Sequence, residues 1–169
     1  MTTIQPATPD DIPTLRDLAR RIWQEYYPGI ISREQIDYML GRMYDATTIR
    51  REMADGVAWD LACRQTEPVG FLSYSIHSTD QRVKLDKLYL VPEWHGQGIG
   101  RQMLQHVRAR SAELGARELW LQVNKQNMRA IRAYERAGFS VREAVVTDIG
   151  GGFVMDDFIM VLRLREQEE

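Results

Sequence analysis

The chain has 169 residues, and its hydrophobic and charged fractions of 44% and 27% are ordinary for one globular domain, which we expect to cover residues 1–169. Its 22 lysines and arginines against 24 aspartates and glutamates give a net charge of −2, so we expect neither a nucleic-acid nor a membrane partner. A lone cysteine, Cys63, excludes an internal disulfide, and no signal peptide or metal signature is present, which favours a mature, metal-free protein of the cytoplasm.

Apolar residues recur at helical spacing in the front of the chain, and alternation takes over after Asp55-Gly56. In chain order the expected elements are a strand at Thr3–Pro6, helices from Thr8 or Asp10 to about Tyr27, from Ser32 through Met43 and over Thr47–Met53, strands at Val57–Arg64, Val69–His77 and Arg82–Val91, a helix from Gln97 or Gly98 to about Leu114, a strand at Glu118–Val123, a helix at Asn127–Ala137, and strands at Phe139–Asp148 and Phe153–Leu164. Together they predict an α/β mixed sheet with helices on both faces, including one right-handed crossover between parallel strands.

The turn WHGQGIG, residues 94–100, carries three glycines where a strand passes into a helix. Glycine at such density indicates positive φ angles or a backbone that approaches a ligand closely. The helix that follows offers unpaired N–H groups and the positive end of its dipole, which together favour a phosphate. The turn is therefore a candidate phosphate site.

Spacing separates three kinds of phosphate loop. A dinucleotide fingerprint needs GxGxxG, but Arg101 and Met103 stand where its last glycine should be. A nucleotide-triphosphate loop needs Gly-Lys-Ser/Thr, which occurs nowhere in the chain. The remaining interpretation is a pyrophosphate held by consecutive backbone N–H groups from about Gln97 to Arg101, without a lysine or a metal.

Two motifs carry a family resemblance. The stretch from Val91 to Gly100 resembles motif A of the GNAT superfamily of acetyl-coenzyme A-dependent N-acetyltransferases, and Asn127-x-x-Ala130-x-x-x-Tyr134-x-x-x-Gly138-Phe139 resembles its motif B. The resemblance implies a single-domain acyl-CoA N-acyltransferase fold, with a mixed, mostly antiparallel sheet of about seven strands and a splayed central strand pair. The acetyl-CoA positions that it implies are Leu90, Val91, His95, Gly96, Gln97, Gly98, Ile99, Gly100, Arg101, Asn127, Ala130 and Tyr134.

The resemblance also implies chemical roles. Tyr134 would give a proton to the coenzyme A thiolate, and main-chain N–H groups at Leu90 and Val91 would meet the thioester and the pantetheine arm. Lys84 stands where many relatives have a carboxylate, so Asp86 is the substitute base, with Glu93 as a weaker alternative. Three blander interpretations stay open: a core role for Tyr134, a lysine-paired surface carboxylate for Asp86, and a turn histidine for His95, which replaces the usual Arg or Gln of motif A.

The acceptor site is the part least defined by motifs. Trp23, Tyr26 and Tyr27 in the front, with Asp156 and the neighbouring Asp157 near the end, could surround a cation, although core packing explains them too. YYPGIISREQIDYML and DIGGGFVMDDFIM look similar to a bacterial branch that includes polyamine N-acetyltransferases. We therefore expect acetyl transfer to a primary amine of a small molecule in a ternary complex. A non-catalytic acyl-CoA sensor, a protein N-terminal or lysine acetyltransferase, and a homodimeric assembly stay open.

Overall fold

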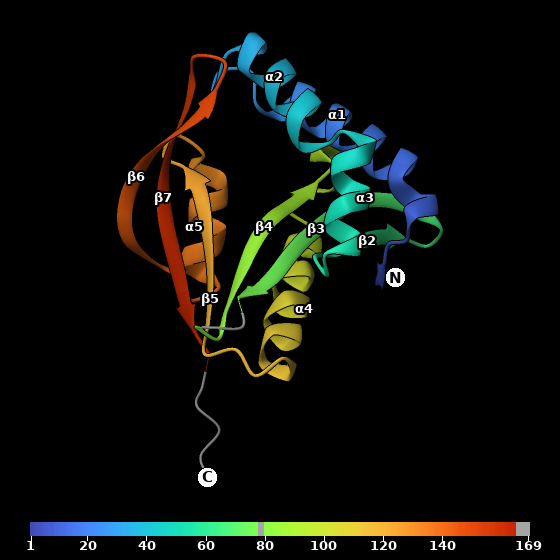
Figure 1. The fold of residues 1–169 in the computed structure, drawn as a ribbon. Coiled ribbons are helices and arrows are strands. Elements are labelled where there is room, and N and C mark those ends of the chain that lie inside the picture. Colours follow the sequence, from blue (N-terminus) through green and yellow to red (C-terminus); the bar gives the residue numbers. More distant parts are fainter. Residues whose placement is uncertain (78–79, 165–169) are drawn as a thin grey trace. The chain divides into compact units, whose positions relative to one another are not determined.

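The computed structural model describes residues 1–77 and 80–164 (Figure 1). Each helix and strand expected from the sequence is present among these residues, with ends shifted by a few positions. The elements are β1 (Thr2–Pro6), η1 (Pro9–Asp11), α1 (Ile12–Tyr26), α2 (Arg33–Met43), α3 (Ala46–Ala54), β2 (Ala58–Arg64), β3 (Glu67–His77), β4 (Arg82–Leu90), η2 (Pro92–Trp94), α4 (Ile99–Glu113), β5 (Glu118–Asn124), α5 (Met128–Arg136), β6 (Ser140–Gly150) and β7 (Phe153–Arg163).

The strands form one mixed sheet with the order β1-β2-β3-β4-β5-β7-β6 among the residues described. The pairs β1–β2, β2–β3, β5–β7 and β6–β7 are antiparallel, and β4–β5 is parallel, as the predicted crossover requires. The parallel register covers Arg82–Leu85 and Glu118–Leu121 and ends before either strand does. The predicted α/β class with a mixed, mostly antiparallel sheet is confirmed.

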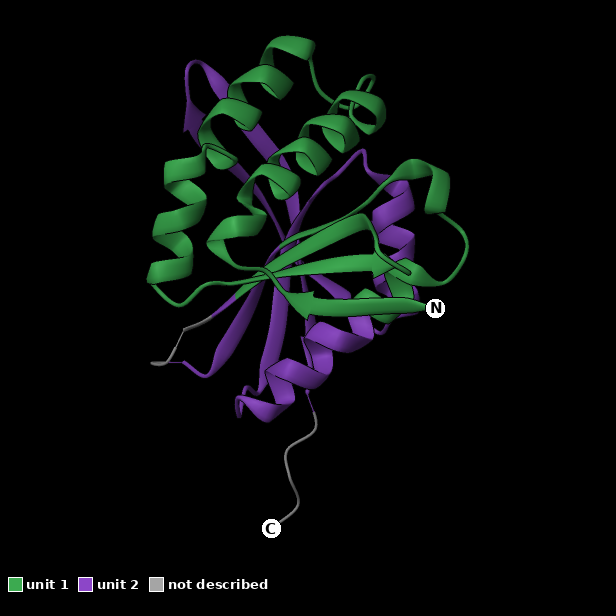
Figure 2. Ribbon diagram, turned by 90° about the vertical axis from the view of Figure 1, so that its right-hand side faces the viewer, with its two compact units in different colours: residues 1–74, 87–103 green, residues 75–86, 104–169 purple. Residues whose placement is uncertain are grey.

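The chain divides into two compact units (Figure 2). Unit 1 contains Met1–Tyr74 and Lys87–Met103, and unit 2 contains Ser75–Asp86 and Leu104–Glu169. The strand β4 and the helix α4 therefore contribute residues to both units. The candidate phosphate turn belongs to unit 1, and the candidate proton donor Tyr134 belongs to unit 2.

Unit 1 is built on three helices that pack against one another. The inner face of α1 buries Leu15, Ile22 and Trp23, and burying a side chain of this size stabilises a fold by about 1.5–3 kcal/mol. Ser32 caps α2 by accepting a hydrogen bond from the Gln35 N–H, and Asp45 caps α3 in the same way from the Thr47 N–H. These caps explain why the helices begin where they do.

Unit 2 shows the alternation expected of a sheet that is covered on one face. Leu119, Leu121 and Val123 are buried along β5, while the residues between them are half-buried. The helix α5 begins at the cap residue Asn127, whose side chain accepts a hydrogen bond from the Ala130 N–H. The cap therefore places the start of α5 directly after the end of β5.

Candidate active site

The chain leaves β4 through η2 and a glycine turn before it enters α4, and unit 1 contains this path as far as Met103 in the helix. The Trp94 N–H donates to the Val91 carbonyl oxygen at 2.9 Å, which closes the short η2 helix. Gly96 and Gly98 then take φ angles of +77° and +84°, which other residues rarely adopt. Two of the three glycines are therefore required by the backbone path itself.

The backbone at the head of α4 offers N–H groups that come before the first helical hydrogen bond. The first helical bond runs from the Gln102 N–H to the Gly98 carbonyl oxygen at 3.1 Å, so the N–H groups of Ile99, Gly100 and Arg101 precede the helical ladder. A Cβ atom placed on Gly96, Gly98 or Gly100 would meet nothing within 4 Å. This cradle of unhindered N–H groups fits a pyrophosphate of the kind that coenzyme A carries.

His95 ties the turn to the end of β4. Its Nε2–H donates to the Leu90 carbonyl oxygen at 2.8 Å, and its ring lies edge-on to the Tyr26 ring with centroids 5.8 Å apart. The histidine therefore ties the start of the turn to the last residue of β4. A direct contact between His95 and phosphate stays a prediction.

The end of β4 is packed tightly against β3. A Cβ atom on Gly70 would lie 2.5 Å from the Tyr89 carbonyl oxygen, so only glycine fits at that position of β3. The Val91 N–H donates to the Val69 carbonyl oxygen at 2.9 Å. This bond occupies the Val91 N–H that the sequence analysis assigned to the thioester, and Leu90 is the main-chain candidate that stays.

The helix α5 of unit 2 brings Asn127 and Tyr134 onto one face, two turns apart. Asn127 is buried, and its Oδ1 accepts a hydrogen bond from the Ala130 N–H at 3.3 Å. Asn127 and Ala130 therefore form the N-terminal cap of α5. Tyr134 is half-buried, and its ring lies 5.7 Å from the Phe139 ring. The cap and the ring contact orient Tyr134, and its role as a proton donor stays a prediction.

The two carboxylates proposed as bases, Asp86 and Glu93, each form an ion pair with a basic side chain. Asp86 in unit 2 has Lys84 Nζ at 3.5 Å from its Oδ1 and accepts a hydrogen bond from the Ser75 hydroxyl at 3.4 Å. Glu93 in unit 1 forms an ion pair with Arg21 at 2.6 Å. The lysine pairing considered for Asp86 in the sequence analysis is therefore present.

The aromatic residues assigned to the acceptor form a cluster inside unit 1. Trp23 stacks on Tyr27 with centroids 4.4 Å apart, and its Nε1–H donates to the Tyr44 hydroxyl at 3.2 Å. Trp23 is only 2% exposed, and burial raises the pKa of Tyr44 well above its usual value. The core interpretation describes Trp23 best. Tyr44 and Tyr89 also contact the Trp23 ring, with centroids 6.0 Å and 5.7 Å away, and nothing in their local sequence pattern distinguishes them from other apolar positions.

The two neighbouring aspartates of β7 in unit 2, Asp156 and Asp157, differ in how much of each side chain is exposed to solvent. The Asp156 side chain is 55% exposed and lies 2.8 Å from Lys125 Nζ, whereas Asp157 is 1% exposed. Burial first, and then the charge of Asp156, raise the pKa of Asp157 to about 6, against the opposing charges of Lys84 and Lys125. Asp156 is the aspartate that the sequence places at the substrate, whereas the buried member of the pair is Asp157.

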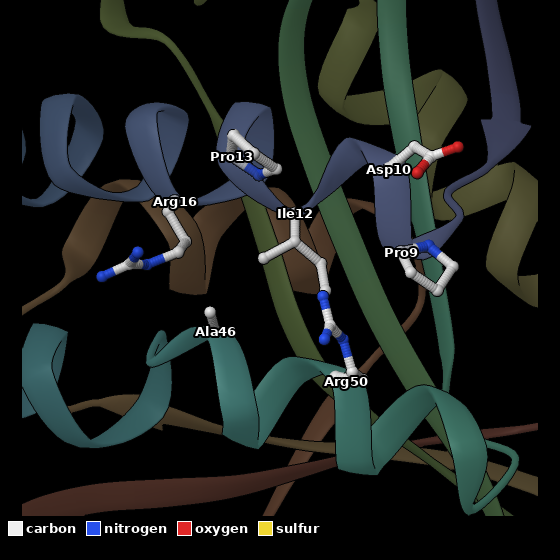
Figure 3. A pocket seen from close by; sticks show the side chains of 7 residues that line it. All are labelled: Pro9, Asp10, Ile12, Pro13, Arg16, Ala46 and Arg50. Atoms are coloured by element: carbon white, nitrogen blue, oxygen red, sulfur yellow. The ribbon is translucent and has the colours of Figure 1, made fainter.

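A surface hollow of about 320 Å³ lies in unit 1 where α1 and α3 begin (Figure 3). Its lining residues are Pro9, Asp10, Ile12, Pro13, Arg16, Ala46 and Arg50. Arg16 Nε donates to the Tyr44 carbonyl oxygen at 2.9 Å, so that guanidinium helps to join α1 to the end of α2. None of the site residues expected from the sequence lines this hollow, and we assign it no chemistry.

The mixed sheet and the glycine turn before α4 agree with the N-acetyltransferase fold that the two sequence motifs imply. The chain belongs to the Acetyltransferase (GNAT) family, which matches residues 13–139. This confirms the family resemblance and the acetyl-CoA co-substrate that it implied. Within the described part of the chain, no group of three or more His, Cys, Asp or Glu residues is placed to hold a metal ion, and no helix there could span a membrane.

Two curated relatives and one crystal structure support this assignment. An uncharacterized N-acetyltransferase of Mycobacterium tuberculosis is 28% identical over 91% of this chain and 98% of its own length. A spermidine N(1)-acetyltransferase of Thermoplasma acidophilum is 28% identical over 87% of this chain and 91% of its own length. The PaiA N-acetyltransferase of the same organism, solved in complex with coenzyme A, has a TM-score of 0.84 and 26% identity over 97% of this chain and 99% of that one.

Proposed function

We propose that the protein transfers an acetyl group from acetyl-CoA to a primary amine of a small, polyamine-like molecule, by direct attack in a ternary complex. The observation that carries the transfer reaction is the unhindered N–H cradle between Gly96 and Arg101, because it fits the co-substrate of the family. The amine class is supported by the similarity to the spermidine N(1)-acetyltransferase, which extends over nearly the whole of both chains.

Each step of this reaction requires a particular group of the protein. Acetyl-CoA supplies an activated carbonyl and a thiolate leaving group. The cradle holds the phosphates, and the end of β4 aligns the thioester. Tyr134 gives its proton to the departing sulfur, which is feasible because a tyrosine hydroxyl with an ordinary pKa of about 10 is protonated at neutral pH. A base must collect a proton from the amine, directly or through water, because alkylamines with pKa values of about 10.4 are mostly protonated there.

An amine panel tests the proposal. Purified protein is mixed with acetyl-CoA and with spermidine, putrescine, a peptide with a free N-terminus or a lysine-containing peptide, and thiol release is followed alongside the mass of each product. We expect the polyamines to give the fastest amine-dependent release. Faster acetylation of a peptide would replace the small-molecule assignment with a protein acetyltransferase. Acetyl-CoA binding without amine-dependent thiol release would overturn the enzyme and favour a sensor.

A further inference from the structure

Asp157 is an unusual group in the sheet of unit 2. In register it stands opposite Asn124, the last residue of β5, and opposite Val145 of β6. Among the residues that the structure describes, neither oxygen of its buried carboxylate has a hydrogen-bond partner. Buried polar groups in native proteins are nearly always hydrogen-bonded, so a buried carboxylate without a partner calls for a ligand or a function.

The charges around Asp157 do not compensate it directly. Lys84 of β4 forms its ion pair with Asp86, and Lys125, just after β5, forms its ion pair with Asp156. Both lysines attract the Asp157 carboxylate from a distance, Asp156 on the same strand repels it, and its β6 partner Val145 carries no charge. An ionised carboxylate is costly to bury unless a cation or hydrogen-bond donors meet it. The group most suited to this position is therefore a cation that the chain does not itself provide.

The place of Asp157 in the sheet suits a substrate. Its register partner Asn124 ends β5, the second strand of the parallel β4–β5 pair. Ligands of open α/β sheets bind beyond the carboxyl ends of parallel strands. The same strand end leads through the Asn127 cap into α5, which carries Tyr134. Asp157 and the proposed proton donor are thus both placed by the carboxyl end of β5, within one unit.

We propose that the Asp157 carboxylate receives the ammonium group of the acceptor amine and takes up the first proton that this group loses. The inference rests on the proposed function and identifies the residue that selects a cationic amine. The ammonium nitrogen loses two protons as the C–N bond forms and the C–S bond breaks. One proton passes to Asp157 and then to water, and the other replaces the proton that Tyr134 gives to the sulfur.

Asp157 suits this task better than the carboxylate predicted from the sequence. The Asp86 side chain is 26% exposed and already has two partners, Lys84 and Ser75. The pKa of Asp157, raised to about 6 mainly by burial, leaves it ionised in most molecules at neutral pH and yet more basic than an ordinary aspartate. A general base works best when its pKa lies near the operating pH.

The experiment compares Asp157→Asn with Asp148→Asn, which removes a carboxylate from the same β6–β7 hairpin and keeps an oxygen for the Gly150 N–H. For Asp157→Asn we expect kcat/KM for spermidine to fall by roughly a hundredfold or more, loss of the acidic limb of the pH profile, and unchanged binding of acetyl-CoA by calorimetry. Asp148→Asn should match the wild type. A variant at Asp157 that keeps both its amine kinetics and its acidic limb would overturn the proposal.

Two further readouts separate this proposal from the proposed function. In the wild-type protein, carboxyl-carbon NMR should give Asp157 a titration midpoint near pH 6 that falls when spermidine binds to the coenzyme A complex. A midpoint that spermidine does not move would contradict the inference, even if the Asn variant failed to fold.

If no amine is acetylated, the proposed function fails by itself. Spermidine binding that depends on Asp157 would then still support the amine site, and binding that is independent of Asp157 would remove it.

Discussion

The two units make their candidate sites from different materials. Unit 1 presents main-chain N–H groups on a glycine turn, where side chains contribute little beyond the His95 tie to Leu90. Unit 2 presents side chains, Tyr134 on α5 and Asp157 on β7, whose properties depend on burial. A main-chain site tolerates changes of side chain but not of backbone geometry, whereas a side-chain site loses its chemistry with a single atom. Substitutions in each unit should therefore separate these two kinds of site.

The largest effect concerns stability in unit 2. The pKa of Asp157 is raised from 3.8 to about 6, so between these values the folded state binds more protons than the unfolded state, and stability falls as the pH rises through that window. Above pH 6 the ionised group costs at most about 3 kcal/mol. Asp157→Asn should therefore unfold at a higher temperature than the wild type at pH 8, with little difference near pH 4. An equal difference at both pH values would contradict the buried charge.

The second prediction concerns the backbone of unit 1. Gly98→Val places a β-branched residue at a φ of +84°, where strain of about 1–3 kcal/mol is expected, so acetyl-CoA should bind roughly tenfold to a hundredfold more weakly. Gly41→Ala, in α2 at an ordinary φ with open space around it, is the matched control and should leave binding unchanged. Calorimetry with acetyl-CoA measures both. Equal affinity of Gly98→Val and the control would mean that the turn does not hold the co-substrate.

The third prediction removes one atom from unit 2. Tyr134→Phe keeps the ring beside Phe139 and deletes the hydroxyl, so turnover should fall by at least about tenfold while acetyl-CoA affinity changes little. Tyr38→Phe removes a hydroxyl of α2 that accepts a hydrogen bond from Arg42 at 2.8 Å, and it serves as the control. Steady-state kinetics with the best amine of the panel give the comparison. Full turnover in Tyr134→Phe would remove the tyrosine from the mechanism.

The smallest effect concerns the tie within unit 1. His95→Ala removes the hydrogen bond to the Leu90 carbonyl oxygen, which is worth about 1 kcal/mol, so KM for acetyl-CoA should rise by about fivefold. His95→Gln retains a donor and should recover most of this loss. An unchanged KM in His95→Ala would show that η2 and the glycines position the turn without the histidine.

Much of the fold could be predicted because local chemistry specifies it. Ser32 and Asn127 carry cap side chains at the starts of α2 and α5, and the glycine spacing between Gly96 and Gly100 requires a turn of unusual backbone geometry. The same local rules predict the phosphate cradle, because it is made of main chain. The family motifs then supplied Tyr134, which no pattern of apolar residues would have distinguished from a core tyrosine.

The remainder depends on contacts that local sequence does not encode. In FVMDDFIM, apolar residues flank both aspartates, so alternation could not say whether Asp156 or Asp157 is buried; pairing with β5 and β6 decides it. The motif places the Val91 N–H at the thioester, and local sequence does not show that this group donates to Val69, which is far away in the sequence. The sequence places Trp23 at the acceptor because aromatics can surround a cation; its burial depends on the packing of three helices, which local sequence does not encode, and the acceptor role stays a prediction.

Calorimetric titration of the wild-type protein with acetyl-CoA, with ATP and NAD as controls, tests the central claim most directly. We predict one-to-one binding of acetyl-CoA with a micromolar dissociation constant and no heat from either control, because ATP and NAD lack the pantetheine arm and the thioester that the end of β4 would hold beside the phosphate cradle. No binding of acetyl-CoA, or equal binding of ATP, would contradict the assignment of the turn and the transfer reaction that depends on it.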